Sequence, residues 1–408
     1  MGCTSTLKYI WNTILFPDKY FWPFFHYCNI HSIFNCYLSS IYSYVDDHRV
    51  CCFFAHNTEC VSLEPQSPLF SCGELMQNLF LRCCMWVLGA SAVFGNVLVV
   101  VRRLQENIKK TGPYVQSFLV VNLAISDSFM GIYMLILASV DAYYGAEYFQ
   151  YAEVWRSSVL CKVAGFLSLL SSEASVFFLV LLTIDRFQGL VYPFSSRRLG
   201  RLSVKIVSVC LWLGLVVLSL VPTLLADTNS DFYGLSDVCI GLPLITRPTS
   251  YSISQGAVES ELSSRSFDVP VPEDHKAAWY FSIALFLGVN MLLFLIILIL
   301  YSLMFIQVKL SSKRVGRIPD REDDIKMAIK MAVIVGTDFL CWMPIIVMGV
   351  LSQTGLVVIP VSVYAWSAVL ILPINSSLNP YLYTISTMIS SKKKVQNGEK
   401  NEMALRRR

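Results

Sequence analysis

Two clusters of polar residues interrupt the apolar stretches near the C-terminal end of this chain. They combine a carboxylate, side-chain amides, hydroxyls, an indole and two prolines. An ionisable side chain at membrane depth costs on the order of 2.5–3.5 kcal/mol on insertion scales, so such groups are expected to serve a function. Carboxylate, hydroxyl and amide oxygens can bind a hard cation, and the same groups can bond one helix to another. The residues are Thr337, Asp338, Trp342 and Pro344 in the first cluster, and Asn375, Ser376, Asn379, Pro380 and Tyr383 in the second.

The composition is that of a membrane protein. Of the 408 residues, 55% are hydrophobic and only 15% are charged, whereas soluble domains carry roughly 25% charged residues. The net charge of +4 is too small to indicate a nucleic-acid partner. The sequence contains no nucleophile–base pair, phosphate-binding glycine loop or zinc-ligand spacing, so we do not expect an enzyme.

Seven apolar stretches are long enough to cross a membrane. About 20 apolar residues span roughly 30 Å of hydrocarbon, and each stretch must be helical because lipid offers the backbone no other hydrogen-bond partner. We therefore expect an all-α membrane protein with a seven-transmembrane helix bundle. The expected spans are 79–103, 114–141, 159–188, 204–226, 278–307, 325–351 and 358–385.

Lysine and arginine predict the orientation, because they accumulate in cytoplasmic connections. They gather after the first, third and fifth spans and in the tail, whereas the connections after the second and fourth spans are acidic. We expect the N-terminus outside and the C-terminus inside the cell. The basic groups are Arg102, Arg103, Lys109 and Lys110; Arg197, Arg198, Arg201 and Lys205; Lys309, Lys313, Arg314, Arg317 and Arg321; and, in the tail, Lys392, Lys393, Lys394, Arg406, Arg407 and Arg408.

Six short motifs follow one another in these spans. They are Gly95-Asn96-Val97, the stretch Asn122 to Asp127, Asp185-Arg186-Phe187, Trp212, the stretch Cys341 to Pro344, and the stretch Asn379 to Tyr383. Any one of them is weak evidence, but together and in this order they resemble the rhodopsin-like G-protein-coupled receptors. The resemblance covers about 79–390 and implies a plasma-membrane receptor that signals through heterotrimeric G proteins.

A closer resemblance is to the leucine-rich-repeat-containing receptors, and within them to the relaxin-type peptide receptors. Seven stretches carry it: Met130–Met134, Val140–Gly145, Ser172–Val176, Cys239–Leu244, Phe286–Asn290, Thr337–Cys341 and Leu372–Asn375. Cys51–Phe54 and Ser71–Leu75 resemble the hinge that joins the ectodomain of such receptors to the first span. We find no leucine-rich repeat and no low-density-lipoprotein-type module before this hinge.

These patterns divide the chain into four parts. Residues 1–50 are an N-terminal segment that we expect to be a truncated or misassigned start of the ectodomain, with an eighth span over 20–45 as the alternative. Residues 51–78 are the extracellular hinge, 79–385 the receptor domain, and 386–408 a short basic cytoplasmic tail. The hinge cysteines favour disulfides on the outer face over a metal site, and their pairing is open. They are Cys51, Cys52, Cys60 and Cys72.

The resemblance implies a buried sodium pocket centred on Asp127. One carboxylate surrounded by hydroxyl and amide oxygens suits a hard cation. The alternative is a hydrogen-bonded polar cluster without metal, and no other cofactor is expected. The pocket residues are Asp127, Ser175, Asn375, Ser376 and Asn379.

The resemblance also implies a clamp at the cytoplasmic side, between Arg186 of the Asp185-Arg186 motif and Asp324 at the start of the sixth span. A guanidinium–carboxylate contact is strong when it is partly shielded from water. Alternatively, Asp324 only favours the N-terminus of its own helix.

Activation-switch residues follow from the same comparison. Asp338 needs a partner in mid-span, and Asn379 is the candidate; a protonated Asp338 bonded to its own helix is the alternative. Glu173 faces the bundle interior, where it shapes a ligand cavity or bonds a neighbouring helix. The full switch set is Asp338, Trp342, Pro344, Asn379, Pro380, Tyr383 and Tyr301.

Cys161 and Cys239 match the disulfide that joins the third span to the second outer loop in this class. We therefore expect a receptor that passes the signal of an extracellular peptide or protein hormone, or of its own hinge, to G proteins and on to adenylate cyclase. One rival is a truncated receptor that acts by dimerisation or trafficking. Another is an ion-coupled transporter, which would predict internal repeats and broken helices that the sequence does not show.

Overall fold

A computed structural model gives the fold of the chain, which divides into two compact units, Met1–Gln66 and Ser67–Arg408. The first unit contains β1 (Ser43–Val45) and β2 (Cys60–Ser62), which pair in parallel. The residues that the structure describes are 43–45, 60–62, 73–76, 78–109, 114–192, 199–225, 233, 237–240, 250–252, 266–268, 281, 283–314, 332–333, 335–337, 339–344, 346–348, 367–371 and 373–382.

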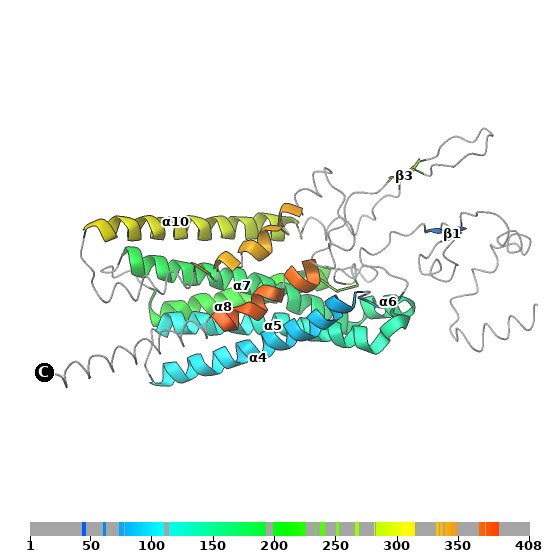
Figure 1. Ribbon diagram of the computed structural model, residues 1–408, viewed down its shortest axis with the longest axis horizontal. Helices are drawn as coiled ribbons and strands as arrows, with labels where there is room; N and C mark the ends of the chain where they lie inside the picture. The colour runs from blue at the N-terminus through cyan, green and yellow to red at the C-terminus, as the bar shows by residue number, and fades with distance from the viewer. Residues whose placement is uncertain are drawn as a thin grey trace, which may run out of the picture. The chain divides into compact units, whose positions relative to one another are not determined.

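The second unit is built from long helices that lie side by side (Figure 1). In this bundle α4 packs on α5, α5 packs on α7, and α7 packs on both α8 and α10. The helices are α4 (Leu79–Lys109), α5 (Tyr114–Tyr144), α6 (Tyr148–Ser157), α7 (Val159–Val191), α8 (Arg201–Leu225) and α10 (Asn290–Arg314). Further elements are the 3-10 turn η4 (Gly145–Glu147), the π-helices η6 (Ile283–Val289) and η7 (Ser367–Ile371), and the antiparallel pair β3 (Ser250–Ser252) and β4 (Ser266–Asp268).

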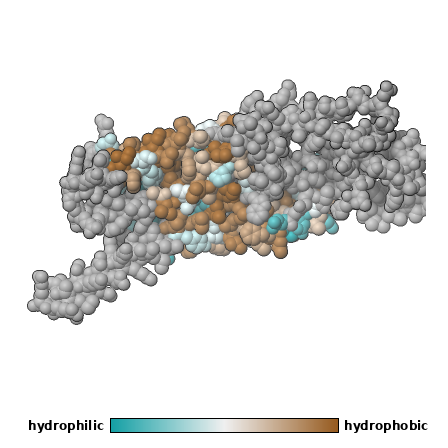
Figure 2. All heavy atoms as spheres, turned by 45° about the horizontal axis from the view of Figure 1, so that its top comes forward, coloured by the Kyte–Doolittle hydropathy of each residue, from teal (hydrophilic) through white to brown (hydrophobic). Residues whose placement is uncertain are grey.

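Burial distinguishes the inner helix from the outer ones. In the most apolar stretch of α7, 78% of the residues are buried, against 28% in α4 and 22% in α8. The outer helices instead present large apolar side chains, such as Phe94 and Leu213, to the surroundings. Figure 2 shows hydrophobic side chains gathered over one face of the bundle. An apolar flank of this kind suits contact with lipid, and α7 lies in the interior, packed against α5, α8 and α10.

Local sequence sets the ends of the helices at one end of the bundle. Gly145 takes a left-handed backbone conformation, with a φ of 52°, directly after α5. Glycine adopts this conformation without steric cost, so it ends the helix and turns the chain into α6. At the start of α7 the Ser158 hydroxyl accepts a hydrogen bond from the Cys161 backbone N–H at 3.1 Å, a side-chain cap that fixes where this helix begins.

The first five predicted spans agree with the fold. In the described residues, five helices are long and apolar enough to cross a membrane, and a shorter apolar helix runs over Val335–Met348. The fifth span differs from the prediction, because it opens as the π-helix η6 before α10 continues to Arg314. The sixth and seventh spans are described only in part, and the orientation of the termini stays a prediction.

Candidate functional site

The centre of the site is Asp127 on α5, whose carboxylate is fully buried. Three side chains donate hydrogen bonds to it from two other helical segments. On α7, the Ser175 hydroxyl lies 3.2 Å from Oδ1. From the segment 373–382, the Ser376 hydroxyl lies 3.0 Å from Oδ1 and the Asn379 amide lies 2.8 Å from Oδ2. One carboxylate therefore ties three spans together.

The segment 373–382 is held against α4 as well. Asn96 donates its side-chain amide to the backbone oxygen of Ser376 at 2.9 Å. One residue earlier, Gly95 faces Pro380 so closely that an added Cβ would lie 2.8 Å from the proline ring. Asn375 is buried on the same segment, 3% exposed. All five predicted pocket residues are buried and lie on α5, α7 and the segment 373–382. Asp127 is in direct contact with three of the others, Ser175, Ser376 and Asn379.

The oxygen atoms around Asp127 are of the kind that binds a sodium ion. Its carboxylate and the hydroxyls of Ser175 and Ser376 converge within hydrogen-bond distance. The side-chain oxygen of Asn379 is buried and has no hydrogen-bond partner in the described part of the chain. Hydroxyl groups rotate freely enough to offer lone pairs instead of protons, so the same atoms can serve a hard cation as ligands. Without an ion, the three donors alone satisfy the carboxylate.

A second buried acid lies on α7, two residues before Ser175. Glu173 is fully buried and accepts a hydrogen bond from the Asn290 amide on α10, with 3.0 Å between Nδ2 and Oε1. Of the two roles that the sequence allowed, the bond between helices is present.

Several predicted switch residues lie where α10 meets the described part of the sixth span. Trp342 is 5% exposed, and its ring lies 6.3 Å from that of Phe294 on α10. Tyr301, also on α10, is half-buried. Pro344 is exposed. The aromatic contact packs α10 against the described part of the sixth span.

The predicted clamp is described on one side only. Arg186 lies near the end of α7 and forms an ion pair with Asp185, at 3.0 Å between Nη2 and Oδ2. Its predicted partner Asp324 lies outside the described residues, as do Asp338 and Tyr383, so these three assignments stay predictions.

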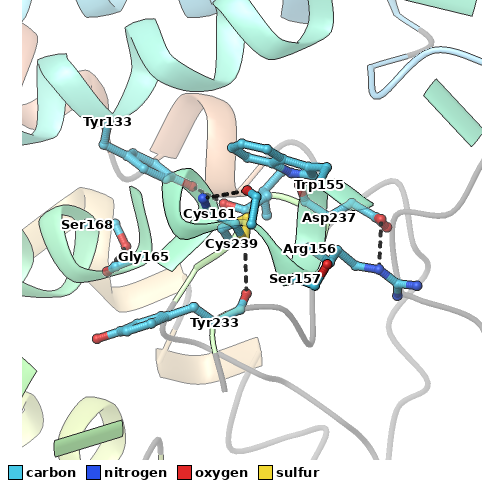
Figure 3. The surroundings of a disulfide bond; sticks show 12 residues. Tyr133, Trp155, Arg156, Ser157, Cys161, Gly165, Ser168, Tyr233, Asp237 and Cys239 are labelled. Atoms are coloured by element: carbon cyan, nitrogen blue, oxygen red, sulfur yellow. Dashed lines mark hydrogen bonds and ion pairs between the residues drawn. A yellow bond between two sulfur atoms is a disulfide. The ribbon is translucent and has the colours of Figure 1, made fainter. Parts of the chain in front are cut away.

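At the other end of α7, Cys161 and Cys239 form the disulfide that the resemblance implied, with 5.4 Å between their Cα atoms. Figure 3 shows the loop residues around Cys239 enclosed by aromatic side chains from α5 and α6. The Tyr133 hydroxyl donates to the backbone oxygen of Val238 at 2.9 Å, and the Trp155 indole donates to that of Asp237 at 2.8 Å. These contacts hold the loop in place in addition to the covalent bond.

The side chain of Asp237 is also held by α6. It accepts a hydrogen bond from the Tyr148 hydroxyl at 3.1 Å and lies 3.9 Å from the Arg156 guanidinium. The backbone at Cys239 has a φ of 47°, a conformation that only a few per cent of non-glycine residues adopt. The surrounding bonds hold the cysteine in this conformation.

Tyr233, earlier in the same loop, packs against Gly165 of α7 (Figure 3). An added Cβ at Gly165 would overlap the tyrosine ring, so only glycine fits there. The Tyr233 hydroxyl donates to the backbone oxygen of Ser219 on α8 at 2.7 Å. Burial raises the pKa of this phenol, so it remains a donor at physiological pH.

The end of the hinge is bonded to the bundle through Asp141 of α5. Its carboxylate accepts the Met76 backbone N–H at 3.1 Å and the Arg82 guanidinium at 2.7 Å. Arg82 also bridges to Glu74 at 2.6 Å. Leu75 and Met76 are buried, 3% and 2% exposed, and the Phe149 backbone N–H donates to Gly73. Residues 73–76 are therefore fastened to α4, α5 and the start of α6.

Sequence reasoning missed this anchor. Asp141 lies in the stretch Val140–Gly145 that carries the resemblance and in an acidic outer connection, but neither pattern predicts Arg82 as its partner. A usable signal was present: Arg82 is a cation at the end of the first span that the topology places outside, where positive charge is not expected without a partner.

Comparison with known proteins agrees with this architecture. The sequence profile of the family "7 transmembrane receptor (rhodopsin family)" matches residues 95–249 and 238–383. The G-protein coupled receptor GRL101 of Lymnaea stagnalis is 37% identical over 84% of this chain and 28% of its own length. The relaxin receptor 2 of Homo sapiens is 31% identical over 84% of this chain and 42% of its own length. A probable glycoprotein hormone G-protein coupled receptor of Anthopleura elegantissima is 32% identical over 81% of this chain and 31% of its own length.

These relatives confirm the resemblance to the relaxin-type receptors, and the chain spans less than half of their length. The matched residues cover the bundle and the Asp127 cluster, and the helices are long enough to cross a membrane. The chain therefore belongs to the rhodopsin family of seven-transmembrane receptors and is a multi-pass protein of the plasma membrane.

Proposed function

We propose that this chain is the transducing bundle of a hormone receptor. An extracellular peptide or protein hormone, or the hinge itself, biases two packings of the helices, and the packing it favours opens the cytoplasmic ends of the fifth and sixth spans to a heterotrimeric G protein. A ligand shifts such an equilibrium only by its difference in affinity for the two packings. The G protein that stimulates adenylate cyclase is the proposed partner.

The observation that carries this proposal is the anchor at Asp141. Residues 73–76 of the hinge are bonded to α4 and α5 through Glu74, Arg82 and Asp141. A pull or twist on the hinge therefore acts directly on the outer ends of two helices. Asp127 lies on the same helix as Asp141, about 14 residues or roughly 21 Å further along at 1.5 Å per residue, and joins α5 to α7 and the segment 373–382. This gives a bonded route from the hinge to the middle of the bundle.

Nucleotide exchange tests the proposal. The full chain is purified in lipid nanodiscs and mixed with heterotrimers of each G-protein class, and loading of a non-hydrolysable GTP analogue is followed over time. We expect loading above that of the G protein alone, most with the class that stimulates adenylate cyclase. Arg186→Ala should abolish the gain.

The matched control is Arg102→Ala, which removes an exposed cation from α4 on the same predicted side of the membrane. It should leave exchange unchanged. Absence of exchange with every heterotrimer, from protein that melts as one folded species, would exclude transduction by this chain and favour a role in dimerisation or trafficking.

We further propose that a sodium ion binds at Asp127, held by oxygens of Ser175, Ser376, Asn375 and Asn379. When bound, the ion neutralises the buried carboxylate and joins the same three spans that its hydrogen bonds join. Thermal unfolding in sodium chloride and in choline chloride at equal ionic strength tests this. Sodium should raise the melting temperature of the wild type and not that of Asp127→Asn; an equal rise in both proteins would place the effect elsewhere.

A further inference from the structure

Two cations of α8 lie over a single aromatic ring of α5. The guanidinium carbon of Arg201 is 5.1 Å from the centre of the Tyr114 ring, and the ammonium nitrogen of Lys205 is 5.9 Å from it. Both cations are exposed, and neither forms an ion pair with a described residue. A cation within about 6 Å of a ring centre is attracted to the ring face, so Tyr114 holds two positive charges in one place.

This place is unfavourable for positive charge. Arg201 is the first residue of α8, and Lys205 follows four residues later on the same face of the helix. The N-terminus of a helix carries a partial positive charge, and like charges four residues apart on a helix repel each other. The ring attracts both cations but neutralises neither, whereas an anion bound to them would remove both penalties.

The neighbouring sequence supplies no such anion. Residues 187–226 contain four basic residues and no aspartate or glutamate. On α5 the first acid is Asp127, which lies 13 residues or about 20 Å beyond Tyr114. Glu106 near the end of α4 and Asp185 near the end of α7 each form an ion pair with an arginine of their own helix.

An apolar surface begins beside the two cations and runs along α8. Its members are exposed and spaced four, three and four residues apart, so they share one face of the helix. The helix is held against α5, because the Trp212 indole donates to the side-chain oxygen of Asn122 at 2.9 Å. A fixed cationic position with apolar surface next to it matches the two parts of a phospholipid. The residues of this surface are Leu202, Ile206, Val209 and Leu213.

We propose that Arg201 and Lys205 bind the phosphate of an anionic phospholipid, whose acyl chains lie along this exposed face of α8. Basic residues near a membrane surface attract anionic lipids, and a guanidinium binds two phosphate oxygens at once. Tyr114 makes this a defined site rather than a diffuse attraction, because it fixes where the two cations lie. The site is on the side of the membrane that the basic residues predict to be cytoplasmic.

Native mass spectrometry of the purified full chain in detergent tests the site. The protein is titrated with phosphatidylserine or with phosphatidylcholine of the same acyl chains, and the bound lipids are counted. We expect the wild type to bind one phosphatidylserine in preference to phosphatidylcholine. Replacing both cations, Arg201→Gln with Lys205→Gln, should weaken this binding about thirtyfold, because each basic residue near the membrane surface contributes about fivefold.

The matched control is Arg102→Gln with Lys109→Gln, which removes two charges from the end of α4 on the same predicted side. It should keep the preferred lipid. Equal losses in the two double variants would mean a diffuse attraction and would overturn the proposal, as would a wild type without preference for phosphatidylserine.

Soluble anions separate the lipid from a free phosphate. Inorganic phosphate and glycerophosphoserine share the chemistry of the headgroup but have no acyl chains. Neither should displace the bound phosphatidylserine at a comparable concentration. Displacement by either would assign the two cations to a soluble anion and contradict the proposed role of the apolar face.

A further measurement needs no variant, in case the double substitution prevents folding. The wild type is placed in phosphatidylcholine nanodiscs that contain a small share of phosphatidylserine with a photoactivatable group in its headgroup. We expect the crosslinks to concentrate on residues 199–209. Crosslinks spread evenly over the basic ends of α4 and α8 would refute a defined site. Since none of these readouts involves a G protein, failure here is distinct from failure of the proposed receptor function.

Discussion

Asp141→Ala should release the end of the hinge from the bundle. The substitution removes the acceptor of the Met76 backbone N–H, which is buried, and an unsatisfied buried donor costs about 1–3 kcal/mol. It also leaves Arg82 with Glu74 alone. Because the Arg82 side chain is 28% exposed, losing that ion pair adds only about 0–1 kcal/mol. The expected loss of folding free energy is therefore about 1–4 kcal/mol.

Two further variants separate the contributions. Asp141→Asn keeps an acceptor oxygen for Met76 and loses only the charge, so it should cost about 1 kcal/mol or less. Glu74→Gln changes a pair whose side chains are 28% and 32% exposed and should have the smallest effect. The order of destabilisation is thus Asp141→Ala, Asp141→Asn, Glu74→Gln.

Thermal unfolding in detergent measures this order. Cys84 and Cys341 are partly buried and form no disulfide, so a dye that fluoresces on reaction with thiols reports the loss of packing around them. If Asp141→Asn were as damaging as Asp141→Ala, the charge rather than the Met76 bond would be the main contribution. If Asp141→Ala had no larger effect than Glu74→Gln, Asp141 would not anchor the hinge, and the route proposed for the signal would be wrong.

Three other expectations follow. Cys161→Ser and Cys239→Ser should each impair surface delivery, and the double variant should add little, because either change breaks the same bond; clearly additive losses would contradict it. Gly165→Ala should reduce the folding free energy by about 1–3 kcal/mol, as at other overpacked sites, because the new Cβ overlaps the Tyr233 ring; an unchanged melting temperature would mean that the loop moves aside freely. Asp324→Ala should raise basal nucleotide exchange about tenfold if the clamp with Arg186 contributes about 1.4 kcal/mol to the closed packing, and unchanged exchange from well-expressed protein would argue against the pair.

The sequence predicts the helices well because lipid leaves few choices. Apolar length decides whether a span exists, and the predicted starts at residues 79, 114 and 159 coincide with those of α4, α5 and α7. It does not predict the π-helix η6, because a change of winding leaves the composition of an apolar stretch unaltered. Nor does it predict β3 and β4, whose three-residue length is below any periodic signal.

For the site, the motifs predicted the residues more reliably than the contacts that those residues form. Ser175 and Asn379 were placed beside Asp127 by resemblance alone, and the distances agree. The motifs did not predict the anchor at Asp141, because its partners are a backbone N–H and an arginine on another helix. Contacts of this kind depend on how the helices pack, which cannot be read directly from the order of the residues.

The two buried acids show why residue type alone cannot assign a chemical role. In sequence, Asp127 and Glu173 are both acids in the middle of apolar stretches, with no basic residue nearby. In the fold, the first is met by three donors on two helical segments, and the second by one amide. The number of donors that reach a buried acid decides how well its oxygens are satisfied, so the same kind of residue has different surroundings at the two positions. Burial makes both positions costly, and the neighbours on other helices determine how each cost is met.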